Sequence, residues 1–192
     1  MAVNIASKIY TVSEYFELEK NSTVRHEFHY GKLIEMPGES IRANDIALNI
    51  VELIRKPFKK KGYKVHAHDI KVEVNLHNIY RYPDIVVAPE TDYTDGYKFT
   101  QPEILMEIAS ENSFSIDSGT KMKEYLKIPT LKYYLIISQD EMSVIFYARK
   151  GSNWIVETYE NAYDFIFLDL FETSLSLADI YEGISFADNI SD

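Results

Sequence analysis

Two short segments, residues 82–88 and 103–110, are apolar at almost every position, whichever way the side chain points. A strand has this pattern when both of its faces are buried, as happens at the centre of a sheet that helices cover on both sides. Around these two segments the chain alternates between predicted helices and predicted strands. This order indicates an α/β or α+β fold built on a mixed sheet.

Capping residues and apolar spacing predict the first two helices. Thr11 and Glu14 have the spacing of a capping box, which opens a short helix. Within residues 43–54, apolar side chains recur every three or four positions, as on the buried stripe of a longer helix. Pro57 is expected to end or kink that helix.

A third helix is expected to start at Asp117 or Ser118 and to end before Pro129. A short helix is expected near Leu175. Alternating or apolar runs predict the strands. A pair of strands is expected within residues 26–36, turning at Tyr30-Gly31-Lys32, and one strand is expected over residues 63–76 with an irregularity near Asp69. Further strands are expected over residues 82–88, 103–110, 132–138, 142–149, 153–159 and 165–168.

Length and composition limit the class of protein. The chain has 192 residues and no long stretch rich in Ser, Gly or Pro, so a single domain over residues 1–192 is expected. The absence of cysteine excludes disulfides and thiolate metal sites, and it fits a reducing compartment. No apolar run approaches the length of a membrane span, and the N-terminus lacks the pattern of a secretory signal. A soluble, cytoplasmic protein with no membrane partner is therefore expected.

The formal net charge of −10 counts against one class of function. Proteins that bind nucleic acid tightly usually carry an excess of Lys and Arg, whereas this chain has 20 basic and 30 acidic residues. The field at a site depends, however, on the residues around that site rather than on the total. The charge therefore weakens a nucleic-acid hypothesis without excluding it.

The most informative polar residues are two acids inside the apolar segments. Asp84 lies in Tyr-Pro-Asp-Ile-Val-Val-Ala and Glu107 in Ile-Leu-Met-Glu-Ile-Ala. For a single such acid, solvation at a strand end or pairing with Lys or Arg is the commoner explanation. Two buried carboxylates in neighbouring strands would repel each other unless a cation lay between them. A hard divalent cation such as Mg²⁺, which prefers oxygen ligands, meets that need.

Lys121 is the third member of the predicted site. On a helix that starts at Asp117, Met122, Tyr125 and Leu126 form the inward stripe and Lys121 lies at its edge. The charged residues on the opposite arc, Lys123, Glu124 and Lys127, are interpreted as solvated. An inward ammonium would neutralise the carboxylates, orient an attacking water or stabilise charge on a phosphate.

The order and spacing of these residues resemble the Uma2 family (DUF820) of restriction-endonuclease-like proteins. The resemblance extends from about Tyr10 to about Ile137. It rests on Glu27 followed by Gly31-Lys-Leu-Ile-Glu-Met36-Pro, on Pro83-Asp84, on Glu107-Ile-Ala-Ser110, on Asp117-x-x-x-Lys121-x-x-x-Tyr125, and on the strand Lys132-Tyr-Tyr-Leu-Ile-Ile.

The resemblance implies the PD-(D/E)XK nuclease fold, a restriction-endonuclease-like mixed β-sheet flanked by helices with an αβββαβ core. It implies that Asp84 and Glu107 bind Mg²⁺, with Mn²⁺ as a possible substitute, and that Glu27 assists. Ala109 stands where the motif usually has lysine, and Lys121 matches the position on the following helix to which that lysine has moved. The implied catalytic set is Asp84, Glu107, Lys121 and Glu27, and the implied partner is DNA.

This chain departs from the family pattern at one further position. The family tends to have a histidine that opens the helix after Met-Ser-Pro, whereas this chain has Asn44 there. A role that depends on that histidine is therefore in doubt.

Other polar groups give weaker signals. His66 and His68 share a face of the predicted strand, but no third metal ligand lies near them in the sequence, so partly exposed strand histidines are the preferred interpretation. The basic run within residues 55–64 either contacts phosphate or complements a helix C-terminus. Asp117 is interpreted first as a helix N-cap and second as a site residue.

Taken together, the sequence predicts a Mg²⁺-dependent phosphodiesterase that acts on DNA. A non-catalytic binding or assembly module that keeps the nuclease fold is the main alternative. Hydrolysis of another phosphate ester is not distinguished from DNA cleavage. The aromatic strands late in the chain lead us to expect a homodimer.

Overall fold

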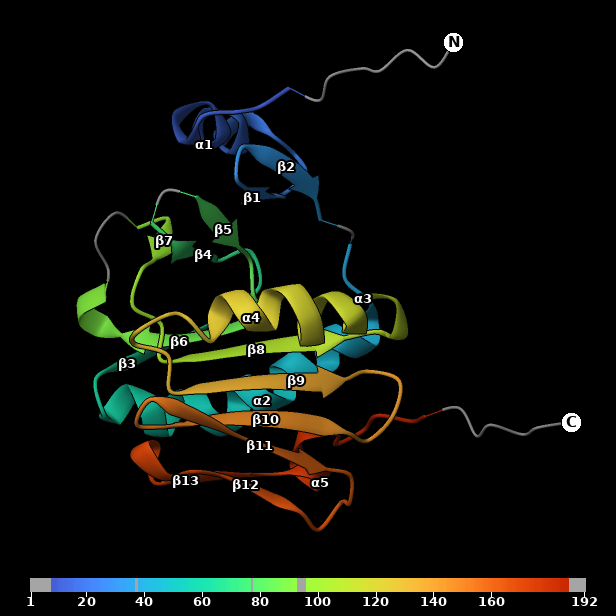
Figure 1. Ribbon diagram of the computed structural model, residues 1–192. Helices are drawn as coiled ribbons and strands as arrows, with labels where there is room; N and C mark the ends of the chain where they lie inside the picture. The colour runs from blue at the N-terminus through green and yellow to red at the C-terminus, as the bar shows by residue number, and fades with distance from the viewer. Residues whose placement is uncertain (1–7, 37, 77, 93–95, 187–192) are drawn as a thin grey trace, which may run out of the picture.

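The computed structural model describes residues 8–36, 38–76, 78–92 and 96–186. Its main body is a six-stranded mixed sheet in which β8 and β9 are parallel and all other neighbours are antiparallel (Figure 1). In spatial order, the six strands are β11 (Asn153–Tyr159), β10 (Val144–Lys150), β9 (Tyr133–Ser138), β8 (Ile104–Ala109), β6 (Ile85–Pro89) and β3 (Tyr63–Ala67).

A second sheet of five strands lies beside the first (Figure 1). Its strands, in spatial order, are β2 (Lys32–Glu35), β1 (His26–His29), β5 (Ile79–Arg81), β4 (Lys71–Asn75) and β7 (Lys98–Phe99). Helix α1 (Val12–Asn21) has the predicted capping box, and its Tyr15 packs in a small core with Phe28 and Tyr80. Helix α1, β1 and β2 thus form a separate layer together with β4, β5 and β7.

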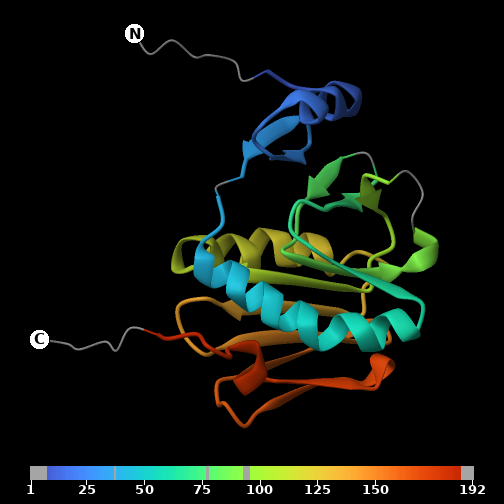
Figure 2. The same ribbon diagram turned by 180° about the vertical axis from the view of Figure 1, so that it is seen from behind.

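Helices cover both faces of the six-stranded sheet (Figures 1 and 2). Helix α2 (Ile41–Lys60) lies on one face, and a continuous helical segment of α3 (Glu111–Ile116), the π-helical turn η2 (Asp117–Lys121) and α4 (Met122–Tyr125) lies on the other. The remaining elements are the short helices η1 (Glu90–Asp92), η3 (Asp169–Phe171) and α5 (Leu177–Ile180), and a two-stranded sheet of β12 (Phe165–Leu168) and β13 (Thr173–Ser176).

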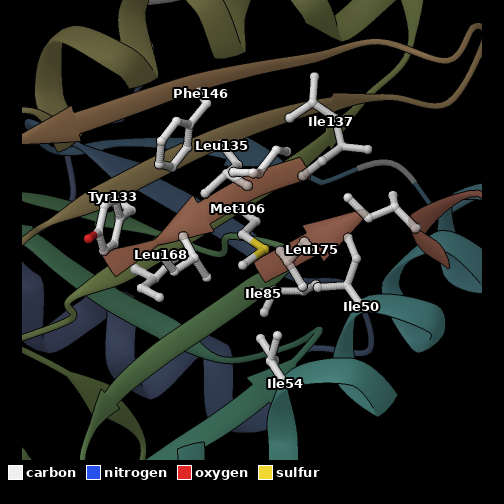
Figure 3. Packing of buried hydrophobic residues seen from close by; sticks show 14 of the residues in the cluster. Ile50, Ile54, Ile85, Met106, Tyr133, Leu135, Ile137, Phe146, Leu168 and Leu175 are labelled. Atoms are coloured by element: carbon white, nitrogen blue, oxygen red, sulfur yellow. The ribbon is translucent and has the colours of Figure 1, made fainter. Parts of the chain in front are cut away.

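The core residues alternate between the two faces, as expected for a central sheet. Ile85 and Val87 of β6 pack in the core under α2, part of which is shown in Figure 3, whereas Val86 and Ala88 pack in the core under α4. All six residues of β8 are buried. The expectation that both strands are buried on two faces is confirmed.

The order of the main elements confirms the predicted fold. Leaving aside the strands of the smaller sheet, the chain runs α2, β3, β6, β8, the α3–α4 segment and β9, which is the αβββαβ order. Among the helices described, none is long and apolar enough to cross a membrane.

The prediction of one strand over residues 63–76 is wrong. The chain breaks at His68 and Asp69, whose φ values of 55° and 53° place both in the left-handed region, and β3 and β4 then belong to different sheets. The apolar alternation continues across the break because each strand has its own buried face. The local sequence pattern therefore does not reveal that β3 and β4 pair with strands of different sheets.

Two helix boundaries also differ from prediction. Helix α2 continues past Pro57 to Lys60, and its last turn is held by Phe58, which is fully buried and stacks on Phe171 with ring centroids 4.6 Å apart. The third helical segment starts at Glu111, where Ser110 is the N-cap, rather than at Asp117 or Ser118. The signal for this start is the Ser110-x-x-Ser113 spacing, in which each side chain caps the other's backbone amide.

We predict that Phe58→Ala lowers the free energy of unfolding by about 3–5 kcal/mol, because it leaves a cavity beneath the last turn of α2. Leu48→Ala is the matched control, since Leu48 lies on the same helix with 54% of its surface exposed, and it should change stability by less than about 0.5 kcal/mol. Urea denaturation measures both. Equal effects of the two substitutions would contradict this account of α2.

Candidate active site

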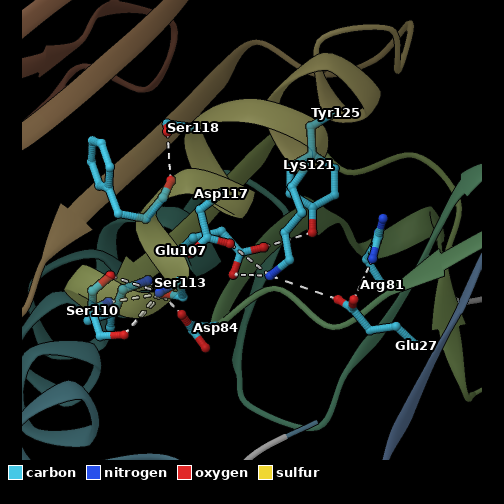
Figure 4. Close-up of polar contacts among 12 residues, drawn as sticks. Glu27, Arg81, Asp84, Glu107, Ser110, Ser113, Asp117, Ser118, Lys121 and Tyr125 are labelled. Carbon is cyan, nitrogen blue, oxygen red and sulfur yellow. Dashed lines mark hydrogen bonds and ion pairs between the residues drawn. The ribbon is translucent and has the colours of Figure 1, made fainter. Parts of the chain in front are cut away.

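Glu107 is the acid that interrupts the apolar strand β8. Alternation along the strand directs its side chain to the face covered by η2 and α4 (Figure 4). The residue is 3% exposed, and its carboxylate accepts a hydrogen bond of 2.7 Å from the Tyr125 hydroxyl. The Lys121 ammonium lies 3.2 Å away, which confirms that Lys121 faces the core.

Lys121 is surrounded by three carboxylates from three different parts of the chain. Its Nζ lies 3.0 Å from Asp117 Oδ1, 3.2 Å from Glu107 Oε2 and 3.8 Å from Glu27 Oε1 (Figure 4). The Lys121 side chain is only 14% exposed, so these ion pairs are largely shielded from water. The structure thus brings three of the four predicted site residues, Glu27, Glu107 and Lys121, into one group.

Asp117 belongs to this group, and its interpretation as an N-cap is wrong. It lies inside the helical segment, at the start of the π-helical turn η2, and it is 3% exposed. A π turn has one more residue than an α turn and is often found at functional sites. Here the turn holds Asp117 and Lys121, which form the 3.0 Å ion pair.

Glu27 comes from β1 of the smaller sheet and is shared between two cations. Its Oε2 accepts a charged hydrogen bond of 2.5 Å from Arg81, while its Oε1 faces Lys121. Arg81 also pairs with Glu124, which in turn contacts His29 at 3.0 Å. The interpretation of Glu124 as a solvated charge is therefore wrong, because this network couples both sheets to α4.

Burial and charge shift the pKa values in this group. Burial raises the pKa of the Glu107 carboxyl well above its ordinary value, although Lys121 opposes the shift. Burial likewise raises the pKa of Asp84 to about 6, against the effect of a backbone hydrogen bond from Ile108. Burial disfavours the Lys121 ammonium, but Glu107, Glu27 and Asp117 outweigh it and hold the pKa of Lys121 above its ordinary value.

Asp84 does not lie within a strand, contrary to the prediction. It occupies a bend between β5 and β6, directly after Pro83, which has no N–H to donate to a strand ladder. Its Oδ2 accepts a 2.6 Å hydrogen bond from the backbone N–H of Ile108, the residue after Glu107. The bend therefore fixes the Asp84 carboxylate at the start of β6, beside the strand that carries Glu107.

A second set of polar side chains meets Asp84 on another side. The carboxylates of Glu39 and Asp84 and the imidazole of His68 each place one ligand-type atom within 4.8 Å of the others. Glu39 Oε2 lies 2.9 Å from His68 Nδ1, and the Asn44 amide lies 3.4 Å from His68 Nε2. The expected pairing of His68 with His66 on one strand face is wrong, because His68 lies in the turn after β3.

Sequence reasoning therefore missed some members of the site and undervalued others. Tyr125 was assigned to the apolar stripe and to the family pattern but was given no role in the site, and Glu39 gave no signal of its own. His68 was considered but set aside for want of a third ligand. Arg81 lies two residues before Pro83 and could have been suspected, since a cation beside buried acids is expected.

A solved structure shares this arrangement of elements. The crystal structure of a protein from Anabaena variabilis ATCC 29413, described as "a putative nuclease belonging to DUF820", matches this chain with a TM-score of 0.71. The match covers 89% of this chain and 97% of that one at 18% sequence identity. The two chains therefore share a fold, in agreement with the restriction-endonuclease-like arrangement expected from the sequence.

Residues 12–179 match the model of the Uma2 family, described as "Putative restriction endonuclease", and this chain belongs to that family. Two similar proteins come from Synechocystis sp. (strain ATCC 27184 / PCC 6803 / Kazusa). Uncharacterized protein sll1609 is 29% identical over 160 residues, which cover 81% of this chain and 90% of that protein. Uncharacterized protein slr1290 is 23% identical over 175 residues, which cover 90% and 92%.

We predict that Lys121→Met lowers the free energy of unfolding of the metal-free protein at pH 7 by about 3–5 kcal/mol, because it leaves buried carboxylates without their cation. Lys123→Met removes an exposed lysine from the same helical segment and should cost less than about 0.5 kcal/mol. Chemical denaturation in the presence of EDTA measures both. A similar, small effect of the two substitutions would show that Lys121 does not stabilise the group.

Proposed function

We propose that this protein is a metal-dependent endonuclease that hydrolyses phosphodiester bonds in DNA. The observation that carries the proposal is the convergence of Lys121 with the buried acids Glu107, Asp117 and Glu27, beside Asp84. Membership of the Uma2 family supports the same class of activity. A purely structural core would not need several buried charges at one point.

The residues present fit a hard divalent cation. Asp84 accepts one hydrogen bond through Oδ2, and no donor among the described residues bonds to its Oδ1. Glu107 is the neighbouring acid, and carboxylate oxygens are the ligands that Mg²⁺ and Mn²⁺ accept. When bound, Mg²⁺ would lower the pKa of a coordinated water and neutralise charge on the scissile phosphate.

The chain's own residues have distinct roles in this proposal. Asp84 and Glu107 hold the ion, and Tyr125 orients Glu107 through its hydroxyl. Lys121 remains an ammonium, because the surrounding carboxylates favour its charged form. It therefore acts as a hydrogen-bond donor that positions the attacking water or stabilises negative charge on the phosphate. Glu27 acts through Lys121 and holds it in place together with Asp117.

A non-catalytic binding module with the same fold is the alternative, and one observation favours it. The net charge of −10 is unusual for a protein that binds DNA tightly. In such a module Lys121 would serve only to neutralise buried acids. Cleavage and metal binding separate the two functions.

We predict that the purified full-length protein nicks plasmid DNA with Mg²⁺ or Mn²⁺ and that EDTA stops the reaction. Asp84→Asn, Glu107→Gln and Lys121→Gln should each lower the rate at least about a hundredfold, because each removes charge that stabilises the transition state. Glu27→Gln should cost about 10–100-fold, as is typical of residues that orient a metal site. Gel-based rate measurements test all four.

The matched controls are Glu111→Gln and Lys123→Met, which change exposed charges on the same helical segment and should leave the rate unchanged. Melting temperatures show whether each variant folds. If the wild-type protein cleaves neither DNA nor RNA with either ion, the catalytic proposal fails and the binding module is favoured.

A further inference from the structure

Glu39, His68 and Asp84 come together from three separate segments. Glu39 precedes Ser40, the N-cap of α2, while His68 lies in the turn after β3 and Asp84 in the bend before β6. One ligand atom from each side chain lies within 4.8 Å of the other two. The side chains of His68 and Glu39 are 27% and 28% exposed, so the group is reachable from solvent without being fully solvated.

Two members of this group, His68 and Asp84, are held by further contacts. The His68 backbone N–H donates to the Asp84 carbonyl at 2.9 Å, and the Ile108 N–H holds Asp84 Oδ2. The Asn44 side chain lies 3.4 Å from His68 Nε2, which leaves Nδ1 directed at Glu39. A histidine that binds metal through one ring nitrogen donates the N–H of its other nitrogen to an acceptor. Asn44 supplies that acceptor when its amide is turned so that Oδ1, rather than Nδ2, faces His68 Nε2.

An ion pair between His68 and Glu39 would account for two members of the group but not for the third. Asp84 places a carboxylate oxygen at the same point, and among the described residues a hydrogen bond is seen only to its Oδ2. Two carboxylates and an imidazole that face one point form a negatively charged set of ligands. A divalent cation would bind all three at once.

We propose that Glu39, His68 and Asp84 form a binding site for a divalent first-row transition ion, with Asn44 orienting the imidazole. Mg²⁺ strongly prefers oxygen ligands, whereas Mn²⁺, Co²⁺ and Zn²⁺ also accept imidazole nitrogen. The ligand set therefore selects a transition ion over Mg²⁺. Asp84 is shared with the proposed cleavage site, but ion binding by this group does not require that the protein cleave DNA.

The test is isothermal titration calorimetry of the full-length, EDTA-treated protein with MnCl₂, CoCl₂ and MgCl₂. We expect Mn²⁺ and Co²⁺ to bind at least about tenfold more tightly than Mg²⁺, and bound Co²⁺ to show a visible spectrum with a nitrogen ligand. His68→Asn should weaken Mn²⁺ binding at least about 10–100-fold. Asparagine is chosen because it tolerates the left-handed backbone at this position.

His66→Asn is the matched control, since His66 lies two residues earlier on β3 and outside the group. It should leave Mn²⁺ affinity unchanged, whereas Glu39→Gln should weaken it. The inference is overturned if His68→Asn binds Mn²⁺ like the wild type while melting normally, or if Mg²⁺ binds as tightly as Mn²⁺ and His68→Asn weakens both equally.

The outcomes also separate this inference from the proposed function. His68-dependent Mn²⁺ binding without any cleavage would support the ion site and refute the nuclease. Cleavage with Mg²⁺ that His68→Asn leaves intact, together with unchanged Mn²⁺ binding, would support the nuclease and refute the ion site.

Discussion

The ion pairs of Lys121 are the interaction on which the arrangement of this protein depends. A buried ammonium is stable only beside carboxylates, and a buried carboxylate only beside a cation or hydrogen-bond donors. Glu27 comes from the smaller sheet, Glu107 from the larger sheet and Asp117 from the helical segment. Moving any of these elements away would leave an uncompensated charge in the interior. One side chain therefore ties together three layers of the fold.

The need to pair buried charges also explains the contribution of the smaller sheet, which supplies Glu27 to Lys121. Its own core around Tyr15, Phe28 and Tyr80 is small. Its strands also carry Glu27 and Arg81, and Arg81 is joined to Glu124 next to the Lys121 group. A sheet that only covered the core would not need such buried ions. The arrangement instead brings acids from both sheets together around Lys121.

The main sheet and the direction of Lys121 could be predicted because they depend on local periodicity. Apolar runs define β6 and β8, and helical spacing turns Lys121 inward. The break at His68 could not be predicted in this way, because β3 and β4 differ only in their distant partners. The inclusion of Asp117 was obscured for a similar reason: a π-helical turn leaves no mark in apolar spacing, and aspartate is also a common N-cap.

The group of Glu39, His68 and Asp84 was harder still to predict from the sequence. His68 was set aside because no third ligand lay near it in the sequence, yet Glu39 and Asp84 reach it through the fold. Asn44, the residue in place of the family's usual histidine, lies beside the His68 ring. The basic run within residues 55–64 lies far from this group. Arg55 is about 22 Å along α2 from the N-cap Ser40, and Lys61 is paired with Glu172. The imidazole of His68 therefore lies beside Asn44, whereas the basic run lies at the other end of α2. The fold thus decides which side chains form this group, and the histidine missing from position 44 does not leave the group without an imidazole.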